Sequence, residues 1–173
     1  MGLPFVFIIS LIIMAVIVIF AVMAIKNFTC RQEQITINLF VSDLRKSVEE
    51  AFYNAKGSQT IFEGTLPKGC SKIEFVCLGF PEEGFDRGWQ RGLGIDDNKA
   101  DDIEKEISFY KDTNYNFFFY PQKSLGTTGV SPVHNINSTG IPISLEKNPT
   151  CLSNKGKIEL FLVNQGKNVL IKK

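Results

Sequence analysis

Side chains that commonly carry out chemistry are few in this sequence of 173 residues. It contains one histidine, His134, and no Gly-x-Ser-x-Gly motif, so a serine or cysteine nucleophile would have no evident base beside it. The cysteines do not form the closely spaced Cys-x-x-Cys pairs that a structural zinc site would require. We therefore expect no catalytic residue, no metal and no cofactor, and a protein that is not an enzyme.

Two polar stretches have the composition of ligand sites but lack the spacing. The acidic residues of 96–106 do not show the alternating acids, central glycine and distal Glu of a calcium loop. Acids at the start of a helix interact favourably with its dipole, so we expect a short helix over 96–108. The glycines of 84–94 are not followed by the Gly-Lys-Ser/Thr of a phosphate-binding loop. We expect that stretch to be a loop pinned by Trp89.

The four cysteines, by contrast, predict disulfide chemistry. Cys30, Cys70, Cys77 and Cys151 are an even number, and disulfides persist in oxidising surroundings. Cys77 lies in a predicted strand and Cys151 enters the last predicted strands, so a bridge between them would join two parts of a sheet. Cys30 and Cys70 would then pair or stay free. Four cysteines allow three pairings, and the sequence leaves the choice open.

The sequence gives conflicting signals about whether the domain that carries these cysteines lies inside or outside the cytoplasm. Asn137 begins an Asn-Ser-Thr glycosylation acceptor and, like the cysteines, favours a domain outside the cytoplasm. Lys26 and Arg31 follow an apolar run that no basic residue precedes, and the positive-inside rule then favours a cytoplasmic domain. We expect the external placement, and the cytoplasmic alternative stays open.

The element that must position all these residues is the stretch from Phe5 to Lys56, which contains no Gly or Pro. As one helix it would be about 75–80 Å long. Its first part, 3–25, is apolar except for Pro4 and Ser10, and about 20 such residues cross a hydrocarbon layer. The run is too long for a secretory signal, so we expect a retained membrane helix.

The second part of this helix carries apolar residues at steps of three and four. This spacing places them on one face, which predicts a helix packed on a sheet. The residues expected to make that contact are Ile37, Phe40, Val41, Leu44, Val48 and Phe52. Gly57 stands where a helix C-terminal cap is expected.

The remainder of the chain reads as a small β domain. Alternating or aromatic-rich runs bounded by turn residues predict five or six mostly antiparallel strands, and 122–140 is expected to be an exposed loop. The expected strands are 59–63, 72–78, 116–120, 141–145, 157–163 and 168–171. The predicted fold class is α+β, with an apolar helix at 1–25, its amphipathic continuation at 26–56 and a globular antiparallel β domain at 57–173. A net charge of +1 argues against a nucleic-acid partner.

An apolar helix half, an amphipathic half ending near residue 55 and a small antiparallel sheet domain resemble a type IV pilin, most closely the archaeal pilin-like proteins. In that family a peptidase cuts after a Gly just before the apolar run, where Gly2 stands, and a Glu occupies the fifth position after it, where Phe7 stands.

This resemblance implies a structural subunit that waits in membrane lipid and then assembles with copies of itself into a helical filament at the cell surface. The residues expected to form the assembly surface are Phe5, Phe7, Ile8, Leu11, Ile12, Val16, Ile19, Phe20 and Met23. Two alternatives stay open: a non-polymerising single-span membrane protein with an extracytoplasmic partner-binding domain, and a membrane-tethered regulator facing the cytoplasm.

Overall fold

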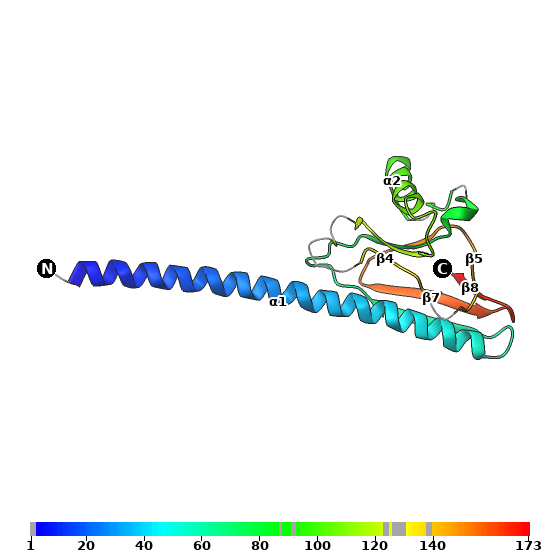
Figure 1. Ribbon diagram of the computed structural model, residues 1–173, viewed down its shortest axis with the longest axis horizontal. Coiled ribbons are helices and arrows are strands. Elements are labelled where there is room, and N and C mark those ends of the chain that lie inside the picture. The colour runs from blue at the N-terminus through cyan, green and yellow to red at the C-terminus, as the bar shows by residue number, and fades with distance from the viewer. Residues whose placement is uncertain (1–2, 87, 91–92, 123–124, 126–130, 138–139) are drawn as a thin grey trace.

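Helix α1 runs without interruption from Leu3 to Tyr53, and the β domain packs against its C-terminal half (Figure 1). The computed structural model describes residues 3–86, 88–90, 93–122, 125, 131–137 and 140–173, with side chains from residue 6 onward. A long apolar N-terminal helix on a small, mostly antiparallel β domain confirms the predicted α+β class.

The strands form two four-stranded sheets. The first sheet has the order β1-β7-β8-β5, with β1 at Gln59–Thr65, β7 at Lys157–Asn164, β8 at Val169–Lys172 and β5 at Ile143–Leu145. The second has the order β4-β3-β2-β6, with β4 at Val133–His134, β3 at Phe117–Tyr120, β2 at Phe75–Leu78 and β6 at Thr150–Ser153. All pairings are antiparallel except that of β5 with β8, which is parallel. The strand order places β5 at an edge of the first sheet.

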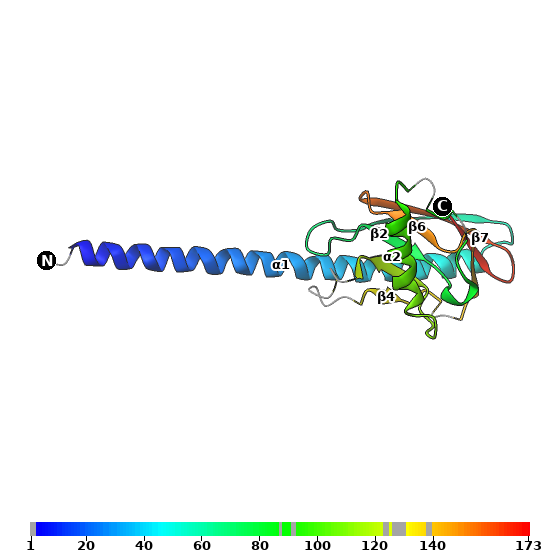
Figure 2. The ribbon, with the colours of Figure 1, turned by 90° about the horizontal axis from the view of Figure 1, so that it is seen from above.

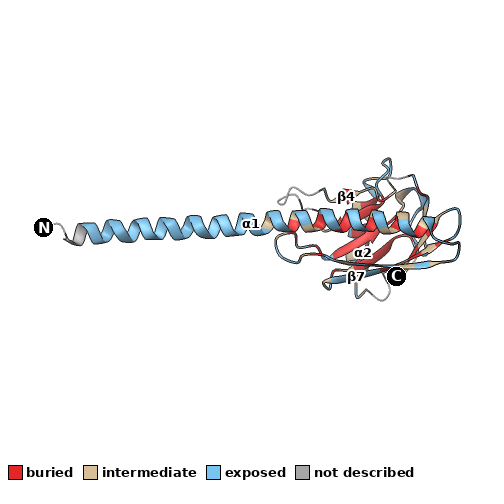
Figure 3. Ribbon diagram, turned by 90° about the horizontal axis from the view of Figure 1, so that it is seen from below, coloured by how far each residue is buried: buried red, intermediate tan, exposed pale blue. Residues whose placement is uncertain are grey.

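The main core lies where α1 and the inner faces of both sheets meet. It takes Ile37 and Leu44 from α1, Leu160 and Ile171 from the first sheet and Phe117 from the second, all buried. A helix with one apolar stripe can bury it only against another element, and here two sheets cover it. The stripe appears as the buried positions along the C-terminal half of α1 in Figure 3.

A second core lies on the other face of the second sheet. Helix α2, at Asp97–Ser108, buries Ile103 and Ile107 there, against Phe118 and the single tryptophan, Trp89. Asp96 caps this helix by accepting a hydrogen bond from the Lys99 backbone N–H. Helices α1 and α2 lie on opposite sides of the strands (Figure 1), and α2 crosses the direction of α1 steeply (Figure 2).

The second sheet is therefore covered on both faces, which explains its sequence. Three consecutive residues of β3, Phe117, Phe118 and Phe119, are all buried because alternate side chains enter different cores. The first sheet has one covered face, and β7 accordingly alternates between buried and more exposed positions.

Three buried asparagines hold together segments that are distant in sequence. Asn164 Nδ2 donates to the carbonyls of Phe52 and Asn54, both at 2.7 Å, and so binds the end of α1 to the end of β7. Asn154 donates to the carbonyls of Pro67 and Ile73. Asn148, the third, holds the turn after β2. Buried side-chain amides that satisfy backbone carbonyls in this way fix the loops against the sheets.

Three local expectations need correction. The described part of 122–140 is not simply an exposed loop, because it contains β4 and buries Leu125 and Ile136. Strand β2 is shorter than the predicted 72–78, and both of its faces are buried rather than one. The described residues form eight strands instead of five or six, since short segments add the edges of both sheets.

Candidate assembly helix and its attachment

The first part of α1 projects from the domain as an apolar rod. Every described residue from Val6 to Ile25 is exposed, and none of them is charged. Exposed fractions at its large apolar side chains run from 40% at Ile9 to 67% at Phe7, so the described part of the chain covers no face of this rod. Figure 3 shows the contrast with the striped half of the same helix.

The dimensions of this rod fit a lipid layer. About 20 residues at about 1.5 Å per residue extend about 30 Å, the thickness of a bilayer hydrocarbon core. Among the described residues, α1 is the one helix long and apolar enough to cross a membrane. Every internal backbone group of a helix is hydrogen-bonded, so the rod can lie in hydrocarbon without unpaired polar atoms. The chain therefore carries a helix suited to association with a membrane.

The expected assembly residues all lie on this rod. The described members of the set are exposed: Phe7, Ile8, Leu11, Ile12, Val16, Ile19, Phe20 and Met23. Phe5 belongs to the backbone of α1, but its side chain is outside the described residues. The residues expected to contact the sheet lie elsewhere on the helix: Ile37, Phe40, Val41, Leu44 and Val48 are buried in the main core, and Phe52 packs against it half-buried.

The helix leaves the domain at a cross-linked point. Cys30, at the first position of α1 that is not fully exposed, forms a disulfide with Cys70 in the connection between β1 and β2. One turn further, Glu33 is buried, and its two carboxylate oxygens accept hydrogen bonds from the backbone N–H groups of Cys70 and Ser71, each at 2.9 Å. A Cβ at Gly69 would overlap Glu33 Oε1, so any larger residue there would force the carboxylate out of its present position. We call the disulfide together with the Glu33 contacts the helix clasp.

The helix is held at two further points along its packed half. Arg45 Nε donates to the Asn135 carbonyl at 2.9 Å, which ties the middle of that half to the segment after β4. Asn164 holds the last turn, where the helix carbonyls would otherwise lack partners. The exposed rod therefore continues into a half of the helix that is fixed to the domain at several points, without a flexible linker.

Both pairs of cysteines are disulfide-bonded, so the protein has two disulfides. Cys77 and Cys151 lie directly opposite one another on the neighbouring strands β2 and β6, and their disulfide joins these strands on the face that lines the second core. The sequence analysis favours a bridge between Cys77 and Cys151. It leaves the state of Cys30 and Cys70 open, because their pairing depends on where the 66–74 connection meets α1.

The remaining candidates of the sequence lie apart from the rod. His134 lies at the end of β4 with its ring against Phe117 and Phe119. Burial, and secondly the nearby Arg45 charge, lower the pKa of His134 below its ordinary value, and its Nε2 has no hydrogen-bond partner.

The predicted loop around Trp89 is anchored as expected. Trp89 is buried, and its Nε1 donates to Glu104 on α2 at 2.6 Å. Within the described residues, no group of three or more His, Cys, Asp or Glu side chains is placed to hold a metal ion. The Asp96 carboxylate serves as the α2 cap, a structural role that the helix start predicts.

Asn137, the predicted glycosylation acceptor, is half-buried just after β4, and the other two residues of its sequon are outside the described residues. The role of Glu33 was not predicted from the sequence, where it looks like an ordinary charge on the polar face of an amphipathic helix. The available signal was its distance of one turn from Cys30, a residue that would not cross-link unless another segment approached the helix there.

The described residues present an apolar rod on a rigidly attached domain. Comparisons with protein-family models, with curated proteins and with solved structures gave no match. The function therefore has to be inferred from the geometry of α1 and its attachments.

Proposed function

We propose that this chain is a structural subunit of a type IV pilus-like surface filament. The apolar half of α1 assembles with the same segment of other copies, and the β domain faces outward. The observation that carries the proposal is the continuity of α1. One unbroken helix joins a rod exposed on all sides, Val6–Ile25, to a half that is fixed in the domain.

The rod has two favourable environments and one unfavourable one. In lipid the apolar side chains contact acyl chains, and in a bundle of copies they contact one another. In water they would stay exposed, at a free-energy cost of about 25 cal/mol per Å² of apolar surface. A subunit with these properties is stored in the membrane as a monomer and transferred to a dry filament core. The stiff attachment supports this role, because the orientation of every domain then follows from the packing of its helix.

The two disulfides support placement of the domain outside the cytoplasm. A domain held by two covalent cross-links suits a surface where the protein is not refolded by chaperones. In this proposal the external domain supplies the outer wall of the filament and its contacts with the surroundings.

A second candidate is a single-span membrane protein that never polymerises and binds a partner through its domain. The residue that favours it is Phe7, which stands where pilins carry a Glu. This candidate needs the rod only as an anchor, and its helix faces lipid throughout.

One substitution experiment separates the two candidates. In cells that express the chain, Ile12→Asp places a charge in the middle of the rod, and Ile12→Leu is the matched control. One Asp costs about 3 kcal/mol at a membrane centre, which the remaining apolar residues outweigh, so the variant is expected to stay in the membrane fraction. Trp89 fluorescence reports whether the domain is folded.

Negative-stain electron microscopy supplies the readout. The filament proposal expects filaments with the unaltered chain and with Ile12→Leu, and none with Ile12→Asp although its domain is folded. Filaments that persist with Ile12→Asp would contradict the proposal. Unaltered chain that stays in the membrane without forming filaments would support the single-span candidate instead.

A further inference from the structure

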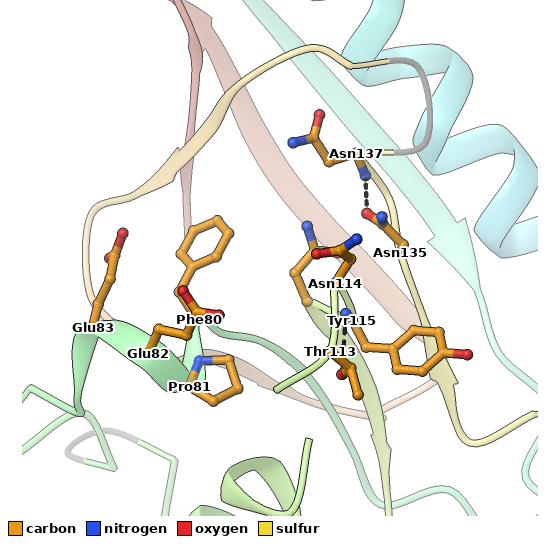
Figure 4. A pocket seen from close by; sticks show the side chains of 10 residues that line it. Phe80, Pro81, Glu82, Glu83, Thr113, Asn114, Tyr115, Asn135 and Asn137 are labelled. Carbon is orange, nitrogen blue, oxygen red and sulfur yellow. Dashed lines mark hydrogen bonds between the residues drawn. The ribbon is translucent and has the colours of Figure 1, made fainter. Parts of the chain in front are cut away.

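A polar cavity of about 330 Å³ opens on the domain, and none of its lining residues belongs to the rod or to the helix clasp. Three segments that are distant in sequence form its walls: the 3-10 helix η1, Pro81–Glu83, with the residue before it; the turn that precedes β3; and the residues that follow β4. Figure 4 shows Glu82, Glu83 and Phe80 on one side of this space, with Asn114 and Asn137 on the other.

The wall formed by η1 is fixed by a buried side chain. Asn148 accepts a hydrogen bond from the Phe80 N–H at 2.8 Å and donates from Nδ2 to the carbonyls of Phe80 and Gly84, at 2.8 and 2.6 Å. The Asn148 backbone N–H donates to Asp86 at 2.7 Å. The turn from β2 into η1 is therefore held in one conformation.

The opposite wall is fixed in the same manner. The Asn116 side chain is buried, and its Oδ1 accepts a hydrogen bond from the Ile136 N–H at 2.9 Å. Asn135 Oδ1 accepts from the Asn137 N–H at 2.8 Å, and the Asn135 carbonyl accepts from Arg45 on α1. Both walls are thus preformed, and a ligand would not have to pay the entropy of ordering them.

The groups presented to the cavity match one class of ligand. Glu82 and Glu83 supply carboxylate acceptors, Thr113 a hydroxyl, Asn114 an amide with donors and an acceptor, and Phe80 an aromatic ring. Sugar hydroxyls both donate and accept hydrogen bonds, and the C–H face of a sugar ring packs on an aromatic side chain. None of the described residues that line the cavity is basic, which disfavours phosphates and acidic sugars.

Asn137 adds an observation that points to a missing partner. Its Oδ1 is buried without a hydrogen bond in the described structure. Its side chain extends from the wall after β4 toward the η1 side (Figure 4). A buried polar atom without a partner is costly, so a ligand hydroxyl that donates to this amide would remove that cost after a small side-chain rotation.

We propose that this cavity binds a neutral carbohydrate, as a monosaccharide, a disaccharide or the end of a glycan. A volume near 330 Å³ lies at the lower end of the range for small-molecule pockets, about 300–1,000 Å³, which suits one or two sugar rings. The proposal stands apart from filament assembly, because none of the cavity residues belongs to α1.

The glycan could come from outside or from the Asn137 sequon itself, and the preparation distinguishes the two sources. Full-length chain from a host that does not glycosylate proteins is purified in a detergent without a sugar head group. Methyl glycosides of glucose, galactose, mannose and N-acetylglucosamine, with lactose and cellobiose, are then titrated while backbone amide shifts are recorded by NMR.

We expect at least one of these sugars to shift the amides of 80–83 and 113–116, with binding in the millimolar range for a single ring. The double variant Glu82→Gln, Glu83→Gln is expected to weaken that binding at least about tenfold, because charge-assisted hydrogen bonds are lost. Asn114→Ala is a second test. The matched controls, Glu50→Gln on α1 and Asn98→Ala on α2, should bind as the unaltered chain does.

Each outcome decides the question. Binding that is localised to the cavity and lost in the cavity variants, with unchanged Trp89 fluorescence, supports an external sugar. If the unmodified chain binds no sugar, but chain glycosylated at Asn137 shows the same amide shifts relative to Asn137→Gln, the glycan is its own. Absence of both effects overturns the proposal. Calcium chloride and lysine methyl ester are titrated as cationic probes of Glu82 and Glu83, and amide shifts produced only by these cations would overturn it as well.

Discussion

The Glu33 carboxylate on α1 lies 2.9 Å from the Ser71 backbone nitrogen, whose N–H donates to it, and the neighbouring Cys70 N–H donates to the other carboxylate oxygen. Thirty-eight residues separate Glu33 from Ser71, and the contact is buried. One side chain satisfies the buried Ser71 donor and the partly buried Cys70 donor, so Glu33 fixes the connection between β1 and β2 to the helix.

The first prediction concerns this contact. Glu33→Ala leaves two backbone donors unpaired and is expected to lower the free energy of unfolding by about 2–4 kcal/mol. Glu33→Gln keeps an acceptor and should lose less. Chemical denaturation of the full chain in detergent, followed by Trp89 fluorescence, measures both.

The control for Glu33 is Glu50→Ala on the same helix, where Glu50 makes only an exposed contact of 3.8 Å with Lys46. Equal losses for Glu33→Ala and Glu50→Ala would show that the buried contact contributes nothing. Gly69→Ala offers an independent check, since its methyl group would displace the Glu33 carboxylate and should destabilise the protein by about 1–3 kcal/mol.

The second prediction concerns pH. Because burial lowers the folded-state pKa of His134 below the ordinary value near 6.5, the unfolded chain takes up this proton more readily. The resulting stability is fully present above about pH 6.5 and is lost as the pH falls toward the folded-state pKa. The loss cannot exceed about 1.4 kcal/mol per pH unit for one proton.

His134→Gln provides the control, because His134 is the chain's single histidine. Free energies of unfolding measured between pH 7.5 and about pH 5.5, above the range where most carboxylates titrate, should decline with falling pH in the unaltered protein and stay level in the variant. Parallel curves for the two proteins would rule out His134 as the source of the dependence.

The third prediction tests the junction at the end of α1. Asn164→Asp keeps the shape of the side chain but replaces a donor to two carbonyls by a carboxylate beside them. We expect a loss of about 3 kcal/mol at neutral pH, from two unmade hydrogen bonds and a buried charge. Gln165→Glu, one residue further and exposed, makes the same change of charge and should leave the midpoint of unfolding almost unchanged.

The fourth prediction concerns the disulfides. Alkylation of the unfolded, unreduced protein should modify no cysteine, and peptide mapping should recover Cys30 with Cys70 and Cys77 with Cys151. Replacing both Cys77 and Cys151 by Ala should cost about 4 kcal/mol on the loop-entropy account, because their separation is 74 residues. Recovery of four free thiols from protein of undisturbed cells would contradict an external domain.

Much of this fold follows from periodicity in the sequence. The steps from Ile37 to Phe52 predict one packed face of a helix. The run of Phe117, Phe118 and Phe119 predicts a strand that is either buried on both faces or closes a sheet edge, and the structure has the first of these. These inferences hold because the spacing of apolar residues reports directly which side of an element is covered. Neither requires knowledge of which other element supplies the cover.

The relationships that the sequence did not reveal are those made between distant segments. The division into two sheets, the parallel pairing of β5 with β8 and the strand inside 122–140 depend on which short segments meet, and a strand as short as Val133–His134 has no period to detect. The cavity likewise collects Phe80, Asn114 and Asn137 from three connections. Glu33 illustrates the same limit, since a carboxylate that binds backbone N–H groups looks in sequence like any charge on an exposed face.

The two disulfides also define a mechanical route through the molecule. From Cys30 the chain is linked covalently to Cys70, then through seven peptide units to Cys77 on β2, and across to Cys151 on β6. A force applied along the rod can therefore reach the second sheet along a path made of covalent bonds alone. The packed half of α1 continues the same helix beyond Cys30, so the covalent route shares the load with the contacts between helix and sheets and limits how far the helix can be pulled from the domain.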